Sequence, residues 1–167
     1  MIQDYVQYNP SKIIFGHGAE EKTAQEIKRL GGTRVLLHYD AGAFIKPLIA
    51  RIRTQLKAAG LYVVELGGVV PNPLISLMKE GCRIVREDKL DFVLAVGGGS
   101  TMDSAKYIAC GAYYEGDLWN HPKFQPIATP VLKHGVVVTM PGTGSDVSTA
   151  AVWRDDSYSP ERKTCVF

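Results

Sequence analysis

The fold class is decided by one segment, Phe92-Val93-Leu94-Ala95-Val96-Gly97-Gly98-Gly99-Ser100. Its first five residues form an unbroken apolar run, which is typical of a strand buried on both faces of a parallel sheet. Three glycines follow, and helical spacing then begins at about Thr101 and continues to Ala112. The segment therefore predicts a buried strand that turns sharply into a helix.

Strand and helix patterns alternate on both sides of this segment. Short apolar runs predict strands at 35–39, 61–65 and 136–139, and helical spacing covers about 19–30, 47–59 and 74–87. We also expect a short N-terminal strand or hairpin at 12–16, and a strand that begins at 163–167. This alternation predicts an α/β fold with a Rossmann-like open sheet, mainly parallel, and helices on both faces. Ligands of such sheets bind at the carboxyl ends of the strands.

Composition and charge narrow the class of function. The 167 residues suffice for one domain with a single core. A formal net charge of +2 gives no field strong enough to favour nucleic acid or a membrane surface. The chain starts without a signal-peptide pattern, and no stretch has the roughly 20 apolar residues of a membrane helix. We therefore expect one cytoplasmic domain, residues 1–167, that binds neither nucleic acid nor membrane.

The glycine segment also carries the clearest chemical information. Glycines let a ligand approach the main chain, and the free amides at a helix start face an anion, assisted by the helix dipole. Ser100 can cap the helix or donate to a phosphate oxygen. The spacing is not GxGxxG, because Met102 occupies the third site, and a tight turn without a ligand is the alternative. Three consecutive glycines exceed what a turn needs, so phosphate binding is favoured.

Two further groups of polar residues follow strands. Asp40 ends the strand at 35–39. It could accept hydrogen bonds from both hydroxyls of an adenosine ribose and repel a 2′-phosphate, or serve as a helix cap or Asx-turn residue.

A second group follows the strand at 136–139. Residues 139–146, Thr-Met-Pro-Gly-Thr-Gly-Ser-Asp, place hydroxyls, amides and a carboxylate on a loop that should run into a helix. Ligand binding and an N-capped junction, with Ser145 or Asp146 as the cap, explain this loop equally well.

Metal binding has no support in the residue pattern. The four histidines include no pair at i,i+3 or i,i+4, and the three cysteines form no CxxC pair. The histidines are best explained as structural or surface residues. We predict no metal ligand within the chain.

Taken together, these segments resemble the N-terminal half of an iron-containing (group III) alcohol dehydrogenase. The resemblance runs through essentially the whole chain. It rests on residues 9–16, the Pro71-Asn72-Pro73 turn, the glycine segment with Asp103 and Lys106, and residues 141–146. The glycine segment and the Pro-Gly-Thr-Gly-Ser segment are specific as a pair at this separation.

The resemblance implies that the matching residues bind a nicotinamide cofactor. Asp40 would hold the adenosine ribose, and Gly98, Gly99 and Ser100 the pyrophosphate, with Gly97 beside them. The path on the nicotinamide side would be lined by Asn72, Thr139 and Thr143, with Val152 nearby. Lys163 would reach the cofactor. Asp103 would shape the glycine loop and the helix that follows it. Family members with a small residue in place of Asp40 tend to use NADPH, so the resemblance favours NAD(H) over NADP(H). Asp146 departs from the glutamate that many members carry there.

The resemblance also implies hydride transfer between a primary alcohol or aldehyde and NAD(H). The family holds Fe²⁺ or Zn²⁺ with one Asp and three His in a helical C-terminal domain, at positions beyond the equivalent of Phe167. We therefore expect a truncated cofactor-binding part that is inactive alone. The loss of the second domain would expose an apolar interface, so self-association into a homo-oligomer is an option. The alternatives are a non-catalytic dinucleotide-binding module, or part of a related enzyme of dehydroquinate synthase or glycerol dehydrogenase type.

Overall fold

A four-stranded parallel sheet forms the centre of the computed structural model, which describes residues 9–121, 125, 127 and 130–166. The strands are β1 (Arg34–Asp40), β2 (Tyr62–Val69), β3 (Phe92–Gly97) and β4 (Lys133–Val138). Their order is β2-β1-β3-β4, and each neighbouring pair is parallel. The prediction of a Rossmann-like, mainly parallel α/β fold is therefore confirmed.

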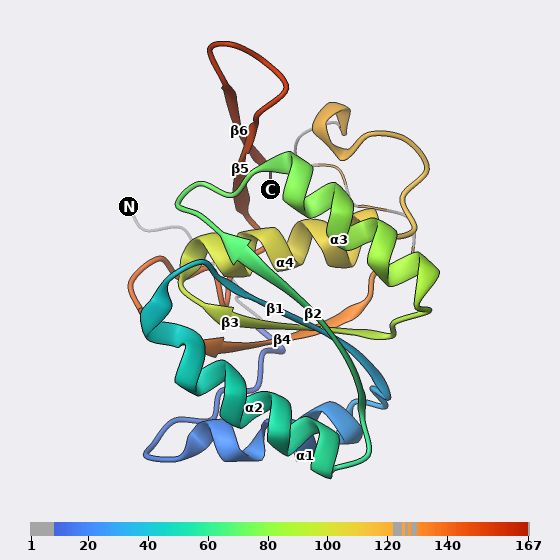
Figure 1. The fold of residues 1–167 in the computed structure, drawn as a ribbon. Coiled ribbons are helices and arrows are strands. Elements are labelled where there is room, and N and C mark those ends of the chain that lie inside the picture. Colours follow the sequence, from blue (N-terminus) through green and yellow to red (C-terminus); the bar gives the residue numbers. More distant parts are fainter. Residues whose placement is uncertain (1–8, 122–124, 126, 128–129, 167) are drawn as a thin grey trace, which may run out of the picture.

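Helices cover both faces of the sheet (Figure 1). On one face lie η1 (Ala19–Lys22), α1 (Thr23–Arg29), η2 (Ala43–Ile45) and α2 (Lys46–Ala58), and on the other lie α3 (Ile75–Glu87) and α4 (Gly99–Gly111). A short turn of helix, η3 (Leu118–Asn120), follows α4. The expected helices at 19–30, 47–59, 74–87 and 101–112 are all present, with small differences at their ends.

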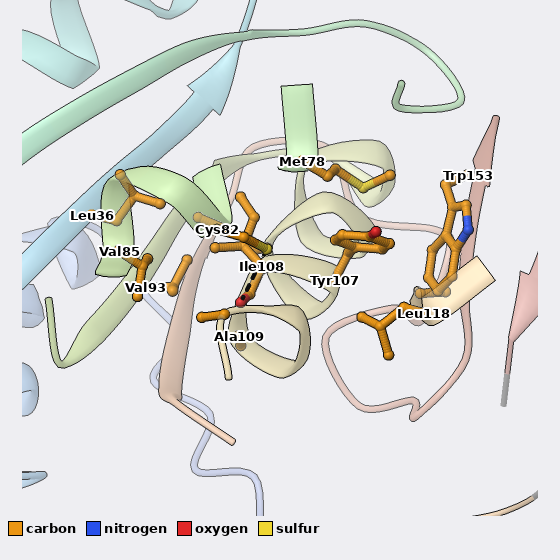
Figure 2. Close-up of a cluster of buried hydrophobic side chains, with 14 of the residues drawn as sticks. Leu36, Met78, Cys82, Val85, Val93, Tyr107, Ile108, Ala109, Leu118 and Trp153 are labelled. Atoms are coloured by element: carbon orange, nitrogen blue, oxygen red, sulfur yellow. Dashed lines mark hydrogen bonds between the residues drawn. The ribbon is translucent and has the colours of Figure 1, made fainter. Parts of the chain in front are cut away.

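The two helical layers explain why the central strands are apolar throughout. Successive residues of a strand point to opposite faces. On β3, Val93 and Ala95 pack in the α3–α4 core, whereas Leu94 and Val96 pack in the α1–α2 core. Figure 2 shows the first of these cores, where side chains from α3 and α4 meet those of the sheet. Because both faces are covered, an unbroken apolar run is what the position requires.

A separate antiparallel hairpin ends the described chain. It consists of β5 (Ala151–Asp155) and β6 (Arg162–Val166). The ring of Trp153 meets that of Tyr107 on α4 edge to face, with centroids 5.1 Å apart (Figure 2). The backbone of Arg154 donates to the carbonyl oxygen of Pro73 at 2.9 Å. The hairpin is thus attached to α4 and to the turn before α3. The expected strand at 163–167 is confirmed as β6, whereas β5 was not predicted.

Two sequence-based expectations are wrong. Residues 12–16 form no strand, because no other described strand lies alongside to supply ladder hydrogen bonds, and Phe15 is fully exposed; residues 1–8 lie outside the described residues. The loop after β4 does not enter a helix either. Gly142 and Gly144 have φ values of 138° and 67°, which end any helical path, and the chain continues into β5.

Candidate functional site

The predicted residues converge on the point where the strand order reverses. From β1 the chain passes through α2 to β2 on one side, and from β3 it passes through α4 to β4 on the other. In open parallel sheets a ligand crevice forms outside the carboxyl ends of the strands at such a point. Asp40 is the last residue of β1, and Gly97 is the last residue of β3.

The glycine segment forms the start of α4. Gly98 is the N-cap residue, with an extended backbone at φ −93° and ψ −164° and no side-chain cap. The amides of Thr101 and Met102 donate to its carbonyl oxygen at 3.0 and 3.1 Å. The amides that precede them have no earlier helical carbonyl to pair with. The 13-residue helix therefore presents free N–H groups and its positive dipole end at the crevice.

The three glycines are not equivalent. A β-carbon on Gly97 would lie 2.3 Å from the Oγ1 atom of Thr101, and one on Gly99 would lie 2.6 Å from the Cγ2 atom of Thr143. At Gly98 the nearest atom would be the Cβ of Met140, at an ordinary contact distance of 3.6 Å. Packing within the protein therefore explains Gly97 and Gly99 but leaves Gly98 unexplained. A ligand that approaches the main chain would explain it.

A cavity of about 310 Å³ lies beside the glycine loop and gathers most of the predicted residues. Its lining includes Asn72, Gly99, Ser100, Asp103, Thr143, Val152 and Lys163. Ser145, Ser148, Ala150 and Ala151 complete the lining. The four other predicted residues, Asp40, Gly97, Gly98 and Thr139, do not line it. Thr139 nevertheless stays beside the glycine loop, because its backbone amide donates to the carbonyl oxygen of Gly97 at 3.0 Å.

Asp40 forms an Asx-turn, one of the roles that the sequence offered for this residue beside ribose binding. Its Oδ1 atom accepts a hydrogen bond from the amide of Gly42 at 2.6 Å. The side chain is half-buried, and Oδ2 has no hydrogen bond from the residues that the structure describes. The turn fixes the carboxylate at the end of β1 and leaves one oxygen for another partner.

Ser100 and Asn72 join the glycine loop to the next turn. The backbone amide of Asn72 donates to the Oγ atom of Ser100 at 3.2 Å, so Ser100 does not act as a helix cap. Asn72 has a left-handed backbone with φ 53°, a conformation that asparagine tolerates better than most residues. Its carbonyl oxygen accepts from the Nε atom of Arg154 at 2.9 Å. The cavity wall on this side is therefore held by α4 and β5 together.

A half-buried polar network joins residues of the cavity lining to Lys106 on α4. Asp103 accepts from the Oγ atom of Ser145 at 2.5 Å and from the amide of Val152 at 3.0 Å. Lys106 donates to the same Oγ atom and to the carbonyl oxygen of Ala150, both at 2.8 Å. Burial lowers the pKa of Lys106, and the negative charges of Asp103 and Asp146 oppose that shift. Ser145 thus links the ammonium to the carboxylate, and the network fastens the loop after β4 to α4.

Sequence reasoning assigned no role to Lys106 or Ser145 in this site. Lys106 appeared only as a matching residue, and Ser145 as a matching residue and as one of two alternative helix caps. Asp103 and Lys106 are three residues apart on α4, which places them on neighbouring positions of one face. That spacing could have indicated a shared partner, but not which residue of the distant loop supplies it.

His38 ties the sheet to the same helix. Its Nδ1 atom lies 2.7 Å from the carbonyl oxygen of Leu66, and its Nε2 atom lies 2.7 Å from the Oγ atom of Ser104 on α4. Because a carbonyl only accepts, Nδ1 carries the proton and Nε2 accepts from Ser104. Burial lowers the pKa of His38 to about 4, and the hydrogen bond to Leu66 opposes this shift. His38 is therefore a neutral structural residue, as expected.

The described residues offer no metal centre. Among residues 9–121, 125, 127 and 130–166, no group of three or more His, Cys, Asp or Glu is arranged to hold a metal ion. The iron implied by the sequence resemblance therefore has no fitting ligand set there. Within the same residues, no helix combines the length and apolar character needed to cross a membrane.

The fold is an open parallel α/β sheet with a glycine loop at the start of α4, an arrangement that is typical of nucleotide-binding domains. The family model of iron-containing alcohol dehydrogenases matches residues 10–166. The chain belongs to that family, as the resemblance predicted.

Individual relatives agree with the family. The chain is 42% identical over 154 residues to the protein named probable NADH-dependent butanol dehydrogenase 1 of Bacillus subtilis. This alignment covers 90% of this chain and 39% of that protein. It is 36% identical over 152 residues to the NADPH-dependent aldehyde reductase YqhD of Escherichia coli, covering 87% of the chain and 38% of the reductase. The solved structure of NADH-dependent butanol dehydrogenase A from Thermotoga maritima superimposes with a TM-score of 0.88 at 36% identity, over 98% of this chain and 41% of that one. The chain thus spans about two fifths of the length of these relatives.

Proposed function

We propose that this chain binds NAD(H) and is the cofactor-binding part of an alcohol dehydrogenase. The observation that carries the proposal is Gly98, at the start of α4 and at the reversal of strand order, where the protein leaves room for a β-carbon. The family match and the NADH-dependent relatives support the same cofactor. One relative is named as NADPH-dependent, so family membership alone does not decide between NADH and NADPH. The preference must depend on residues of this chain.

The arrangement suggests a path for the dinucleotide. The adenosine ribose would lie at Asp40, where the free carboxylate oxygen can accept from its hydroxyls and disfavours a 2′-phosphate. The pyrophosphate would lie on the amides of Gly99 and Ser100, with Gly98 allowing close approach. The nicotinamide half would enter the 310 Å³ cavity, beside Thr143 and Lys163.

The chemistry of this chain would be to hold and orient the cofactor. Hydride transfer is carried by the nicotinamide ring, and the protein supplies position and electrostatics. A primary alcohol or aldehyde is the substrate class that the relatives' names suggest for the whole protein. Because the described residues provide no fitting metal ligands, we propose that the chain alone binds cofactor without turning over alcohol.

The proposal is tested by calorimetric titration of the purified chain with NADH and with NADPH, without added metal. Saturable binding that favours NADH is expected. Failure to bind either nucleotide would contradict the proposal. A second assay mixes the chain with NAD⁺, 1-butanol and either Fe²⁺ or Zn²⁺; no increase in NADH absorbance is expected, and turnover above the protein-free rate would overturn the inactivity of the chain alone.

A further inference from the structure

Phe44 is a large aromatic residue exposed at the ligand edge of the sheet. Its exposed fraction is 70%, although the next residue, Ile45, is buried at 2% in the α1–α2 core. Both belong to η2, the turn of helix that connects the end of β1 to α2. The buried side chain of Ile45 holds this turn against the core. The backbone of Phe44 is therefore fixed in a position from which its side chain faces solvent.

The ring of Phe44 folds back toward Asp40. A β-carbon on Gly42 would lie 2.3 Å from the Cε1 atom of Phe44 and 3.0 Å from the Oδ1 atom of Asp40. Both groups therefore flank the same small volume above Gly42. The backbone of residue 42 has an ordinary φ of −64°, so its conformation does not require glycine. What requires glycine is the ring of Phe44, which occupies the place that a side chain at residue 42 would take.

An aromatic face beside a ribose-binding carboxylate is suited to a nucleobase. In a nucleotide the base is attached to the sugar carbon next to the one that carries the 2′-hydroxyl, so a group close to the carboxylate is within reach of the base. Aromatic side chains bind bases by stacking, which needs an exposed π-face and no particular hydrogen-bonding pattern.

We propose that Phe44 stacks on the adenine base of the dinucleotide whose ribose Asp40 holds. The inference rests on the proposed function and adds to it a residue that determines affinity for the adenosine half. It also assigns a role to Gly42: a methyl group there meets the ring at 2.3 Å and displaces it, so Gly42→Ala should weaken adenosine binding even though Phe44 remains.

The test compares variants of the chain in calorimetric titrations with ADP-ribose, which carries the adenosine half without nicotinamide. Phe44→Ala should weaken binding at least about five- to tenfold, the lower end of the range for a lost base-stacking partner. Phe44→Tyr retains an aromatic face and should bind within about twofold of the unchanged chain. Phe15→Ala is the matched control, because Phe15 is a more exposed phenylalanine outside the site, and it should leave the affinity unchanged.

The outcomes separate this inference from the proposed function. If the unchanged chain binds NADH and ADP-ribose but Phe44→Ala binds ADP-ribose equally well, the stacking role is overturned and the proposed function stands. An equal loss in Phe44→Ala and Phe44→Tyr would also overturn stacking, because the aromatic face would not matter. If the unchanged chain binds neither NADH nor ADP-ribose, the proposed function fails and the inference fails with it.

Discussion

The polar network around Asp103 and the crevice edge at Asp40 and Gly98 lie at the same end of the sheet but use their groups differently. Both oxygens of Asp103 accept hydrogen bonds from the protein, and the ammonium of Lys106 has two protein acceptors. Asp40 has one oxygen that the described residues do not use, and at Gly98 they leave room for a β-carbon.

We propose that this difference separates residues that build the site from residues that contact the ligand. A group whose hydrogen bonds are complete within the protein contributes to folding, and its loss leaves buried partners unsatisfied. A group that remains incomplete contributes little to folding and is available for a ligand. Substitutions in the two regions should therefore change different measured quantities.

The largest expected effect comes from Gly98→Val. The new side chain would fill the place proposed for the pyrophosphate, so NADH affinity should fall by more than about a hundredfold. The extended backbone at Gly98 suits valine, so the melting temperature should change by only a few degrees. Gly99→Val is the matched control, since its side chain meets Thr143 and should lower the melting temperature markedly. Normal NADH binding by Gly98→Val would place the phosphate site elsewhere.

In the other region, Asp103→Ala should mainly reduce stability. It removes the acceptor of Ser145 and Val152 and the carboxylate that most strongly offsets the burial of the Lys106 ammonium, which should cost about 3 kcal/mol in the free energy of unfolding. Urea denaturation measures this change. Ser145→Ala, which keeps both charges, should cost about 1 kcal/mol. A variant as stable as the unchanged chain would contradict the structural role of the network.

His38 should make stability depend on pH. Its pKa is about 4 in the folded chain and near the ordinary 6.5 when unfolded, so between these values the unfolded state binds more protons. Stability is therefore retained above about pH 6.5 and lost as the pH falls toward 4, by roughly 2 to 3 kcal/mol.

The measurement is urea denaturation at pH 7 and pH 4.5 on the unchanged chain and on His38→Asn. The asparagine can still donate and accept hydrogen bonds but does not titrate, so its stability should fall less over the same interval. Parallel pH profiles for the two proteins would show that His38 does not contribute.

The smallest expected effect concerns cofactor choice at Asp40. Asp40→Gly should weaken NADH binding about tenfold and reduce the discrimination against NADPH, because a charged acceptor and a repulsive charge are both lost. Asp40→Asn is the matched variant, since its amide oxygen can still accept from Gly42 while the charge is removed. Unchanged affinity for both nucleotides in both variants would remove Asp40 from the site.

Local patterns predicted the parts of the fold that depend on local sequence. The apolar run at 92–96 and the glycines after it identified β3, the turn and α4, because burial on both faces and a sharp turn each impose a residue type. The position of Asp40 at a strand end likewise followed from the pattern. Its Asx-turn was one of two open interpretations, since the same residue type suits both.

The missed features depend on contacts between distant residues. Ser145 lies 42 residues from Asp103 in sequence, so the sequence offered only a local cap or a ligand contact for its hydroxyl and not this carboxylate. β5 was missed because its identity as a strand comes from pairing with β6 and packing on α4. The strand expected at 12–16 failed for the converse reason, because its apolar pattern has no described neighbour to pair with.

The proposed function depends above all on binding of the NAD(H) pyrophosphate at the start of α4. It is tested most directly by titrating the ¹⁵N-labelled chain with NADH and following its assigned backbone amide resonances. Saturable shifts should be largest at Gly98, Gly99 and Ser100 and should extend to Asp40 and Thr143. Saturable shifts confined to other parts of the chain, or no shifts at all, would contradict it.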